Sequence, residues 1–309
     1  MNASEPSVDA VRDELAIDVA LSTLEARLKL VRKRFSQAVR HGHKNIERIH
    51  QLRVATRRAS TALDLYQVFV PRKRSKQMSQ MLKRARRAAG KVRDCDLLLS
   101  RLNSGSARAE LPSFIKRIHS ERAAAYCALC RLHEKHASSA RLKRRTRALL
   151  TGTRQKAERH HNLAIQKFKD WAPERLRVFI SDFYQAARPD LRDFAQLHQF
   201  RIRSKALRYA MELVAPTFPP EFKRDLSPVI ERLQTLLGDI NDESNFLKTV
   251  GTRLAHKARP SDIDGLKHRL AEEQHALDEL EREFAAWWTT DRRDALRRSF
   301  DEIIAPRAA

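Results

Sequence analysis

Two short stretches of the chain place a histidine and several basic residues at helical spacing. The second stretch carries four such residues at positions i, i+3, i+7 and i+10, namely His198, Arg201, Lys205 and Arg208. At about 100° per residue, they fall within a stripe about 80° wide on one face of a helix. An unpaired row of partly buried cations is costly, so the stripe predicts a binding site for an anion.

Apolar residues surround this stripe. Phe200, Leu207 and Met211 lie on the opposite side of the predicted helix, and Ile202 and Tyr209 lie beside the stripe. A solvated charged face is not usually bordered so closely by apolar residues. The pattern predicts a mostly buried helix with one cationic stripe lining a cavity.

The stretch has a counterpart 148 residues earlier (198 − 50), in which His50 is followed by Arg53 and Arg57. The same offset aligns residues well beyond the motif: Pro71 with Pro219, Ser79 with Ser227, Arg84 with Arg232, Gly90 with Gly238, Asp94 with Asp242, and Leu99 with Leu247. A fixed offset over such a length predicts an internal duplication. Ser60 occupies the position of Arg208, so we expect the first half to make one contact fewer and the second half to bind more strongly.

Helical periodicity runs along nearly the whole chain, and no stretch alternates with period two long enough for a strand. Helices are expected over residues 11–40, 44–70, 74–102 with an interruption or bend near Gly90, 112–136, 173–187, 191–214, 221–255 and 266–304. Residues 103–106 and 259–265 are expected to be loops. Residues 138–161 are strongly basic and are expected to be partly helical, with a break at Gly152.

These elements predict an all-α protein of two similar bundles of about four helices each. The expected domain organisation is a disordered lead-in over residues 1–10 and one domain over residues 11–305. Within that domain we expect a first bundle over 11–137, a basic connection over 138–170 and a second bundle over 171–305.

The composition is strongly basic. The 309 residues include 62 Lys and Arg against 38 Asp and Glu, a formal net charge of +24. Such an excess attracts polyanions. The three cysteines, Cys95, Cys127 and Cys130, suggest no disulfide framework, and no signal peptide or membrane span is visible. A soluble, cytoplasmic protein is expected, with no membrane partner.

The paired motifs resemble the CHAD family, the conserved histidine α-helical domain. The resemblance rests on the two His-x-x-Arg helices and on the segments Gly90–Asp94 and Gly238–Asp242, and it covers about residues 10–305. It implies two pseudo-twofold related four-helix bundles with a basic central channel that binds inorganic polyphosphate. Many members carry a CYTH domain with a Glu-x-Glu-x-Lys signature. This signature is absent here, so the chain resembles a stand-alone member.

Polyphosphate carries about one negative charge per phosphate, and a row of cations can bind it without base recognition. Arginine suits this role because its planar fork donates bidentate hydrogen bonds to phosphate oxygens. The residues expected to bind are His50, Arg53, Arg57, Lys83, Arg84, Arg87, His198, Arg201, Lys205, Arg208, Tyr209 and Arg232. Gly90, Asp94, Gly238 and Asp242 are expected to pack or to orient the arginines, and no cofactor is expected.

Several of these residues could serve the fold or a metal instead of an anion. A single histidine would more often be a satisfied core residue, but two at matched positions before Arg favour an anion site. Asp94 and Asp242 could bind a metal, although salt bridges to the channel arginines are the simpler role. Cys127, Cys130, His133 and His136 would spread around half of one helix, so they cannot all reach one tetrahedral zinc.

The favoured function is noncatalytic binding of polyphosphate, with targeting to polyphosphate granules or regulation of their use. One alternative is a metal-dependent hydrolase or transferase acting on polyphosphate or other phosphoryl groups, which would use carboxylates such as Asp94 and Asp242. Another alternative is a protein that binds nucleic acid or coats a storage granule. The motif helices lack aromatic stacking platforms, which disfavours nucleic acid. The sequence leaves the oligomeric state open.

Overall fold

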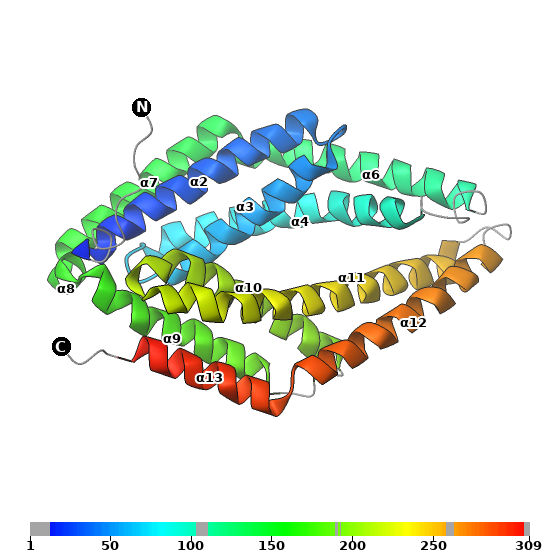
Figure 1. Ribbon diagram of the computed structural model, residues 1–309. Coiled ribbons are helices and arrows are strands. Elements are labelled where there is room, and N and C mark those ends of the chain that lie inside the picture. Colours follow the sequence, from blue (N-terminus) through cyan, green and yellow to red (C-terminus); the bar gives the residue numbers. More distant parts are fainter. Residues whose placement is uncertain (1–12, 103–110, 189–190, 192, 258–262, 306–309) are drawn as a thin grey trace. The chain divides into compact units, whose positions relative to one another are not determined.

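The computed structural model describes residues 13–102, 111–188, 191, 193–257 and 263–305. Over these residues the chain is built of helices (Figure 1), and its β structure is limited to one isolated bridge between Leu15 and Lys167. The predicted all-α class is therefore confirmed. None of the described helices combines the length and the apolar character that crossing a bilayer would demand. The predicted lead-in over residues 1–10 and the predicted loop at 103–106 lie outside the described residues.

The chain divides into two compact units. Residues 21–156 and 246–274 form the unit that contains the His50 motif, here called the first-motif unit. Residues 1–20, 157–245 and 275–309 form the second-motif unit, which contains His198. The boundaries fall inside four helices, so each of these helices contributes residues to both units. The predicted bundle limits at residues 137 and 171 remain predictions.

In the first-motif unit the helices are α2 (Ala16–His41), α3 (Ile46–Leu65), α4 (Arg72–Leu102), α6 (Pro112–Leu132) and α7 (Ser139–Arg159), with a π-helical turn at His133–Ala137. Helix α4 packs against both α3 and α6 (Figure 1). Phe35, Tyr66, Phe69 and Phe114 are fully buried in this unit. This core lies on the side of α3 away from its basic stripe, where Leu52, Ala59 and Leu63 are also buried.

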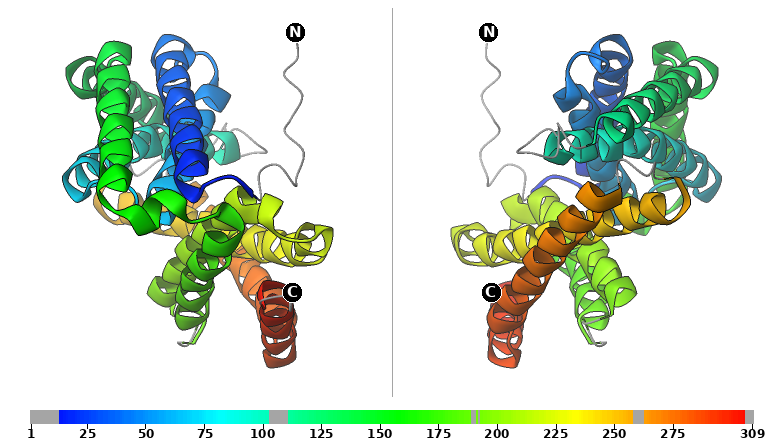
Figure 2. Two further views of the ribbon diagram at one scale, coloured as in Figure 1. Left: turned by 90° about the vertical axis from the view of Figure 1, so that its left-hand side faces the viewer. Right: turned by 90° about the vertical axis from the view of Figure 1, so that its right-hand side faces the viewer.

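The helices of the second-motif unit are α8 (His161–Ile165), α9 (Phe168–Ala186), α10 (Phe194–Val214), α11 (Ser227–Lys257), α12 (Ile263–Trp287) and α13 (Thr290–Ile304). A 3₁₀ turn (Ala215–Thr217) and a π-helical turn (Phe222–Leu226) join α10 to α11. Helix α9 packs against α10, and the rings of Phe183 and Phe200 lie 5.2 Å apart between them. Figure 2 shows α9 and α13 from two further sides; Tyr184 of α9 donates to the Arg293 carbonyl at the start of α13.

The expected break at Gly152 is wrong, because α7 runs through it as a continuous helix. Glycine in a helix interior costs about 1 kcal/mol relative to alanine, which tertiary contacts readily offset. Here the missing side chain is filled by a neighbour: a Cβ at Gly152 would lie 2.9 Å from Nε of Arg74. Arg74 also donates to the Ala148 carbonyl at 2.7 Å. The glycine therefore permits close packing of α4 on α7.

Three other expected boundaries are also wrong. Helix α4 runs through Gly90 without the interruption that was one of the two expectations there, the other being a bend. The last expected helix is two helices, because α12 ends at Trp287 and Thr289 caps α13 by accepting from the Arg292 N–H. Helix α9 begins at Phe168, five residues before Pro173, because Phe168 and Trp171 are buried in the core. Burial thus outweighs the hydrogen bond that proline removes from a helix interior.

Candidate functional site

The two motif helices begin in the same way, at positions 148 residues apart. Asn45 precedes α3 and its side chain accepts from the Glu47 N–H at 3.0 Å. Asp193 precedes α10 and accepts from the Ala195 N–H at 2.9 Å. Such N-caps satisfy a backbone donor that a helix leaves unpaired at its start. Each cap fixes where its helix begins and hence which way the motif side chains point.

The faces opposite the two basic stripes are buried, which orients the stripes. Phe200, Leu207 and Met211 are buried on α10, as predicted. Their counterparts on α3, at the same offset, are Leu52, Ala59 and Leu63, and all three are buried. The flanks of the α10 stripe differ from the prediction: Tyr209 is 4% exposed, but Ile202 is 43% exposed. Ile202 and Tyr209 lie on the same side of the stripe, at about 40° and 20° from His198, so this flank is buried only in part.

In the first-motif unit, Arg53 lies directly over Gly90 of the neighbouring helix. Its Nη1 donates to the Arg86 carbonyl at 3.3 Å. A Cβ placed on Gly90 would lie 2.4 Å from that same Nη1. The glycine at this position therefore makes room for the arginine. The packing role expected of Gly90 is thus to leave space for Arg53: a larger residue here would displace the guanidinium.

Around Arg53 the structure gathers several cations. Burial lowers the pKa of Arg53; Asp94 raises it, and Arg57, Arg86 and Arg93 lower it again. Burial also lowers the pKa of Arg86, and Arg57 lowers it further. Arginine stays charged at neutral pH, so these shifts reflect the cost of holding charged guanidinium groups away from water and, to a lesser degree, the repulsion between them. An anion bound here would relieve that repulsion.

Arg86 was not among the predicted binding residues. It is half-buried, and its Nη1 lies 3.4 Å from Oγ of Ser60 on α3. The structure therefore places a guanidinium at the position where Ser60 had suggested that the first half lacks one. The sequence contains a hint of this exchange. At the 148-residue offset Arg86 aligns with the neutral Gln234, so the half that lacks an arginine on its motif helix has one on the next helix instead.

His50 is exposed at the start of this face. Loss of hydration lowers the pKa of its imidazole, and Arg93, Arg53 and Arg57 lower it further, against an opposing effect of Glu47. Without a bound anion the ring is therefore neutral near pH 7. His50 would therefore gain its positive charge when an anion binds, rather than carry that charge beforehand.

In the second-motif unit, His198 and Arg201 contact side chains of α11. Nδ1 of His198 lies 2.9 Å from Oδ1 of Asn241. Nη2 of Arg201 lies 3.6 Å from Oδ1 of Asp242, to which Asn241 also donates at 3.1 Å. Asp242 is therefore placed where it can orient the Arg201 guanidinium. Gly238 differs from Gly90, because a Cβ there would meet nothing within 4 Å.

Arg208 is held by two neighbours. Its Nε donates to Oε1 of Gln234 at 2.8 Å, and its guanidinium lies 4.6 Å from the centre of the Tyr209 ring. Gln234 in turn donates to the Ser204 carbonyl at 2.8 Å. Because the Tyr209 side chain is buried, it supports Arg208 through its ring rather than presenting its hydroxyl at the surface.

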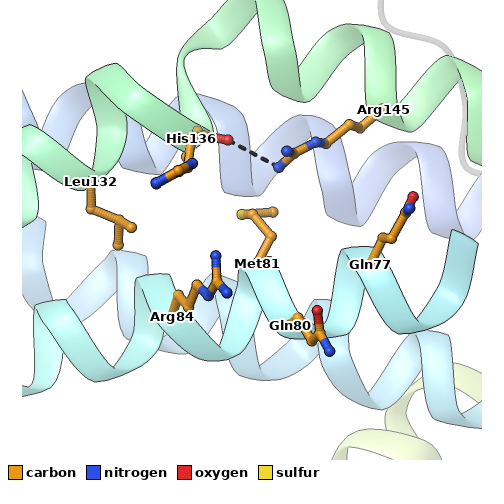
Figure 3. A pocket seen from close by; sticks show the side chains of 8 residues that line it. Gln77, Gln80, Met81, Arg84, Leu132, His136 and Arg145 are labelled. Carbon is orange, nitrogen blue, oxygen red and sulfur yellow. Dashed lines mark hydrogen bonds between the residues drawn. The ribbon is translucent and has the colours of Figure 1, made fainter.

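The remaining predicted residues divide into two groups. Arg57 and Lys205 are half-buried on their stripes, and Lys83 and Arg87 are exposed on the α4 face that carries Gly90. Arg84 lies elsewhere: with His136 and Arg145 it lines a separate cavity of about 220 Å³ (Figure 3). Its counterpart Arg232 forms an ion pair with Glu283 of α12. Neither is brought together with the motif arginines, because each lies about 120° around its helix from the glycine six residues later.

The acidic residues near the motifs make contacts with arginine. Asp94 contributes to the electrostatics of Arg53, and Asp242 lies beside Arg201. Asp96 is buried and accepts from Nε of Arg122 at 2.5 Å. Among the described residues, no group of three or more His, Cys, Asp or Glu side chains is arranged to hold a metal ion. The geometry is that of clustered cations oriented by carboxylates, which suits recognition of an anion with several oxygens.

Comparisons with known proteins identify the fold and the family. The family model described as "CHAD domain" matches residues 22–245. The crystal structure of the CHAD domain from the plant Ricinus communis is similar with a TM-score of 0.69 and 21% identity, covering 88% of this chain and 92% of that one. PptA from Streptomyces chartreusis is similar with a TM-score of 0.60 and 16% identity, covering 89% of this chain and 99% of that one. A search of curated proteins finds no match to the chain. Since the family model spans more than half of the sequence, the chain belongs to the CHAD domain family.

Proposed function

We propose that the protein binds inorganic polyphosphate, without catalysing its turnover, at the cationic faces of α3–α4 and α10–α11. One observation carries the proposal: Arg53 of α3 donates to the Arg86 carbonyl of α4 at 3.3 Å, and the Arg86 guanidinium reaches back to Ser60 of α3 at 3.4 Å, so half-buried guanidinium groups of two helices are gathered on one face. A folded protein that holds such a cluster gains most from a partner with closely spaced negative charges. Polyphosphate has this character, with a charge on every phosphate.

The CHAD resemblance supports the same ligand. It also carries the finer part of the proposal, which is a pseudo-twofold pair of bundles with a basic channel between them. A cytoplasmic location and association with polyphosphate granules belong to the proposal as well. Each of these points depends first on whether the purified protein binds polyphosphate at all.

Calorimetry with polyphosphates of graded length tests the proposal. The affinity per protein should rise with chain length and then level off once the chain spans the site. Arg201→Ala should weaken binding by about 10- to 100-fold, because a hydrogen-bonded charge contact contributes about 1.5–3 kcal/mol. Circular dichroism should show unchanged helicity in that variant. Absence of binding to long chains at physiological salt would refute the proposal.

Two further measurements separate the proposal from the alternatives. Incubation with long-chain polyphosphate and Mg²⁺ or Mn²⁺ should release no phosphate; release that disappears in Asp94→Asn would establish catalysis instead. Duplex DNA at equal phosphate concentration should compete poorly, because its phosphates are held on a stiff double helix, whereas a single flexible polyphosphate chain can follow the arginines of two neighbouring helices. Equal competition would mean that the protein recognises polyanions in general.

A further inference from the structure

The Arg86–Ser60 pair in the first-motif unit and the Arg208–Gln234 pair in the second-motif unit occupy equivalent positions. Ser60 is equivalent to Arg208, and Arg86 to Gln234, both at the 148-residue offset. In each unit the arginine approaches the polar partner on the other helix, at 3.4 Å in the first and 2.8 Å in the second. The arginine has therefore changed helix, from the motif helix in one unit to its neighbour in the other, while the pair is kept.

The backbone contacts around the two pairs change in the same sense. In the first unit, Ser60 on the motif helix donates to the Thr56 carbonyl at 2.9 Å. In the second, Gln234 on the neighbouring helix donates to the Ser204 carbonyl at 2.8 Å. Thr56 and Ser204 are equivalent and fully buried. In both units, therefore, the polar partner of the arginine donates to the carbonyl at this equivalent position.

The exchange is accompanied by a large difference in charge. On the face of α4 that carries Gly90 stand four basic residues: Lys83, Arg86, Arg87 and Arg93. Their equivalents on α11 are Glu231, Gln234, Thr235 and Asn241, none of which is basic. These four positions of α4 lie within about 60° of Gly90 around the helix axis, so they share one face. The α3–α4 face is therefore much more positive than the α10–α11 face, although its motif helix has one base fewer.

We propose that Arg86 takes the place of the missing base at position 60, and that the α3–α4 face is the stronger anion site of the two. This inference rests on the proposed function, and it reverses the expectation from the motif helices alone. The stronger face holds its guanidinium groups on two helices, so a phosphate chain can be contacted from α3 and α4 at once. The weaker face relies on α10, whose His198 and Arg201 already contact Asn241 and Asp242.

A set of exchanges tests the role of Arg86 by titration calorimetry with one polyphosphate length. Arg86→Gln should weaken binding by about 10- to 100-fold, the value of one charged hydrogen-bond contact. Ser60→Arg combined with Arg86→Gln recreates the arrangement of the other unit and should recover most of the affinity. Lys91→Gln removes the same charge from an exposed position about 140° around α4 from Arg86 and should leave the affinity unchanged within about twofold.

The strength of the two faces is compared by paired variants of equal charge. Arg53→Gln with Arg86→Gln should reduce the affinity at least about tenfold more than Arg201→Gln with Arg208→Gln. Equal reductions, or a larger reduction from the second pair, would overturn the inequality of the faces. No recovery in the Ser60→Arg/Arg86→Gln variant, with helicity intact, would overturn the role of Arg86. Failure of the unaltered protein to bind would instead refute the proposed function and, with it, this inference.

Discussion

Gly90 and Gly238 occupy equivalent sequence positions but have different surroundings. At Gly90 an added Cβ would meet Nη1 of Arg53 at 2.4 Å, whereas at Gly238 it would meet nothing within 4 Å. Sequence alignment by the 148-residue offset treats the two glycines alike. The structure shows that one makes room for a cation and that the other does not.

Alanine at these two positions should therefore have separable effects. Gly90→Ala is expected to displace the Arg53 guanidinium and to weaken polyphosphate binding, with little change in folding stability because the tip of a long side chain can move. Gly238→Ala should leave the affinity unchanged and add about 0.5–1 kcal/mol to the free energy of unfolding, since alanine is the better helix former. Calorimetry and urea denaturation of both variants measure the two effects. Equal affinity in both would contradict the packing of Arg53 on Gly90.

His50 gives a prediction in pH. The pKa of its imidazole is lowered in the free protein, so protonation without a ligand destabilises the fold as the pH falls below about 6.5. A bound phosphate favours the charged ring and raises that pKa, so binding takes up a proton. Affinity should rise as the pH falls through and below about 6.5, and should level off only below the lowered free-state pKa. His50→Gln should flatten this rise, measured by calorimetry across the range in buffers of different ionisation enthalpy.

At the scale of elements, the sequence predicted the motif helices well, because their signals are local. The apolar positions of α10 and the charged stripe have a clear helical period, and the 148-residue offset locates the equivalent positions in α3. The errors at Gly152, Pro173 and Thr289 have a different origin. At Gly152 and Pro173, tertiary packing overrides a residue that usually ends a helix, and at Thr289 the capping signal is short.

The candidate site could be predicted only in part for the same reason. Helical spacing on one helix identified Arg53, Arg201 and their neighbours. It could not show which side of α4 faces α3, so Arg84 was included and Arg86 was left out. That information lies in the packing of one helix against another, which local periodicity does not contain.

The corner between α2 and α3 depends on a buried ion pair. Arg122 of α6 donates to Asp96 of α4 and, at 2.9 Å, to the Gly42 carbonyl in the corner. Burial raises the pKa of Asp96, and the Arg122 guanidinium opposes that rise. The pair therefore ties together three elements that support the first motif helix.

Removing one partner of this pair should be strongly destabilising. Arg122→Ala leaves a buried carboxylate without its cation and is expected to lower the free energy of unfolding by about 3–5 kcal/mol. Arg224→Ala, which removes a fully solvated pair with Asp225, should leave the free energy of unfolding nearly unchanged, because water and salt screen exposed pairs. Urea denaturation followed by circular dichroism compares the two. Similar small effects would mean that Asp96 and Arg122 do not form a buried pair in solution.

At the scale of the whole molecule, the net charge of +24 could by itself attract a polyanion, without any contribution from the motif arginines. Any protein so basic attracts polyanions, and salt weakens that attraction whether or not a site exists. The basic run in α7 includes exposed Arg144 and Arg147, which can contribute to such attraction without forming a site. Specific binding is distinguished from general attraction by where the charge lies.

Two double variants with the same net charge separate these cases. Arg53→Gln/Arg57→Gln and Arg144→Gln/Arg147→Gln each remove two positive charges, the first from the α3 stripe and the second from α7. Only the first should lower the slope of log affinity against log salt concentration, by about 0.7 for each phosphate that is no longer neutralised, if the value for single-stranded nucleic acids applies. The second should bind nearly as the unaltered protein does, because salt screens exposed charges that make no direct contact with the ligand. Equal changes in both variants would show that net charge, rather than the motif arginines, governs binding.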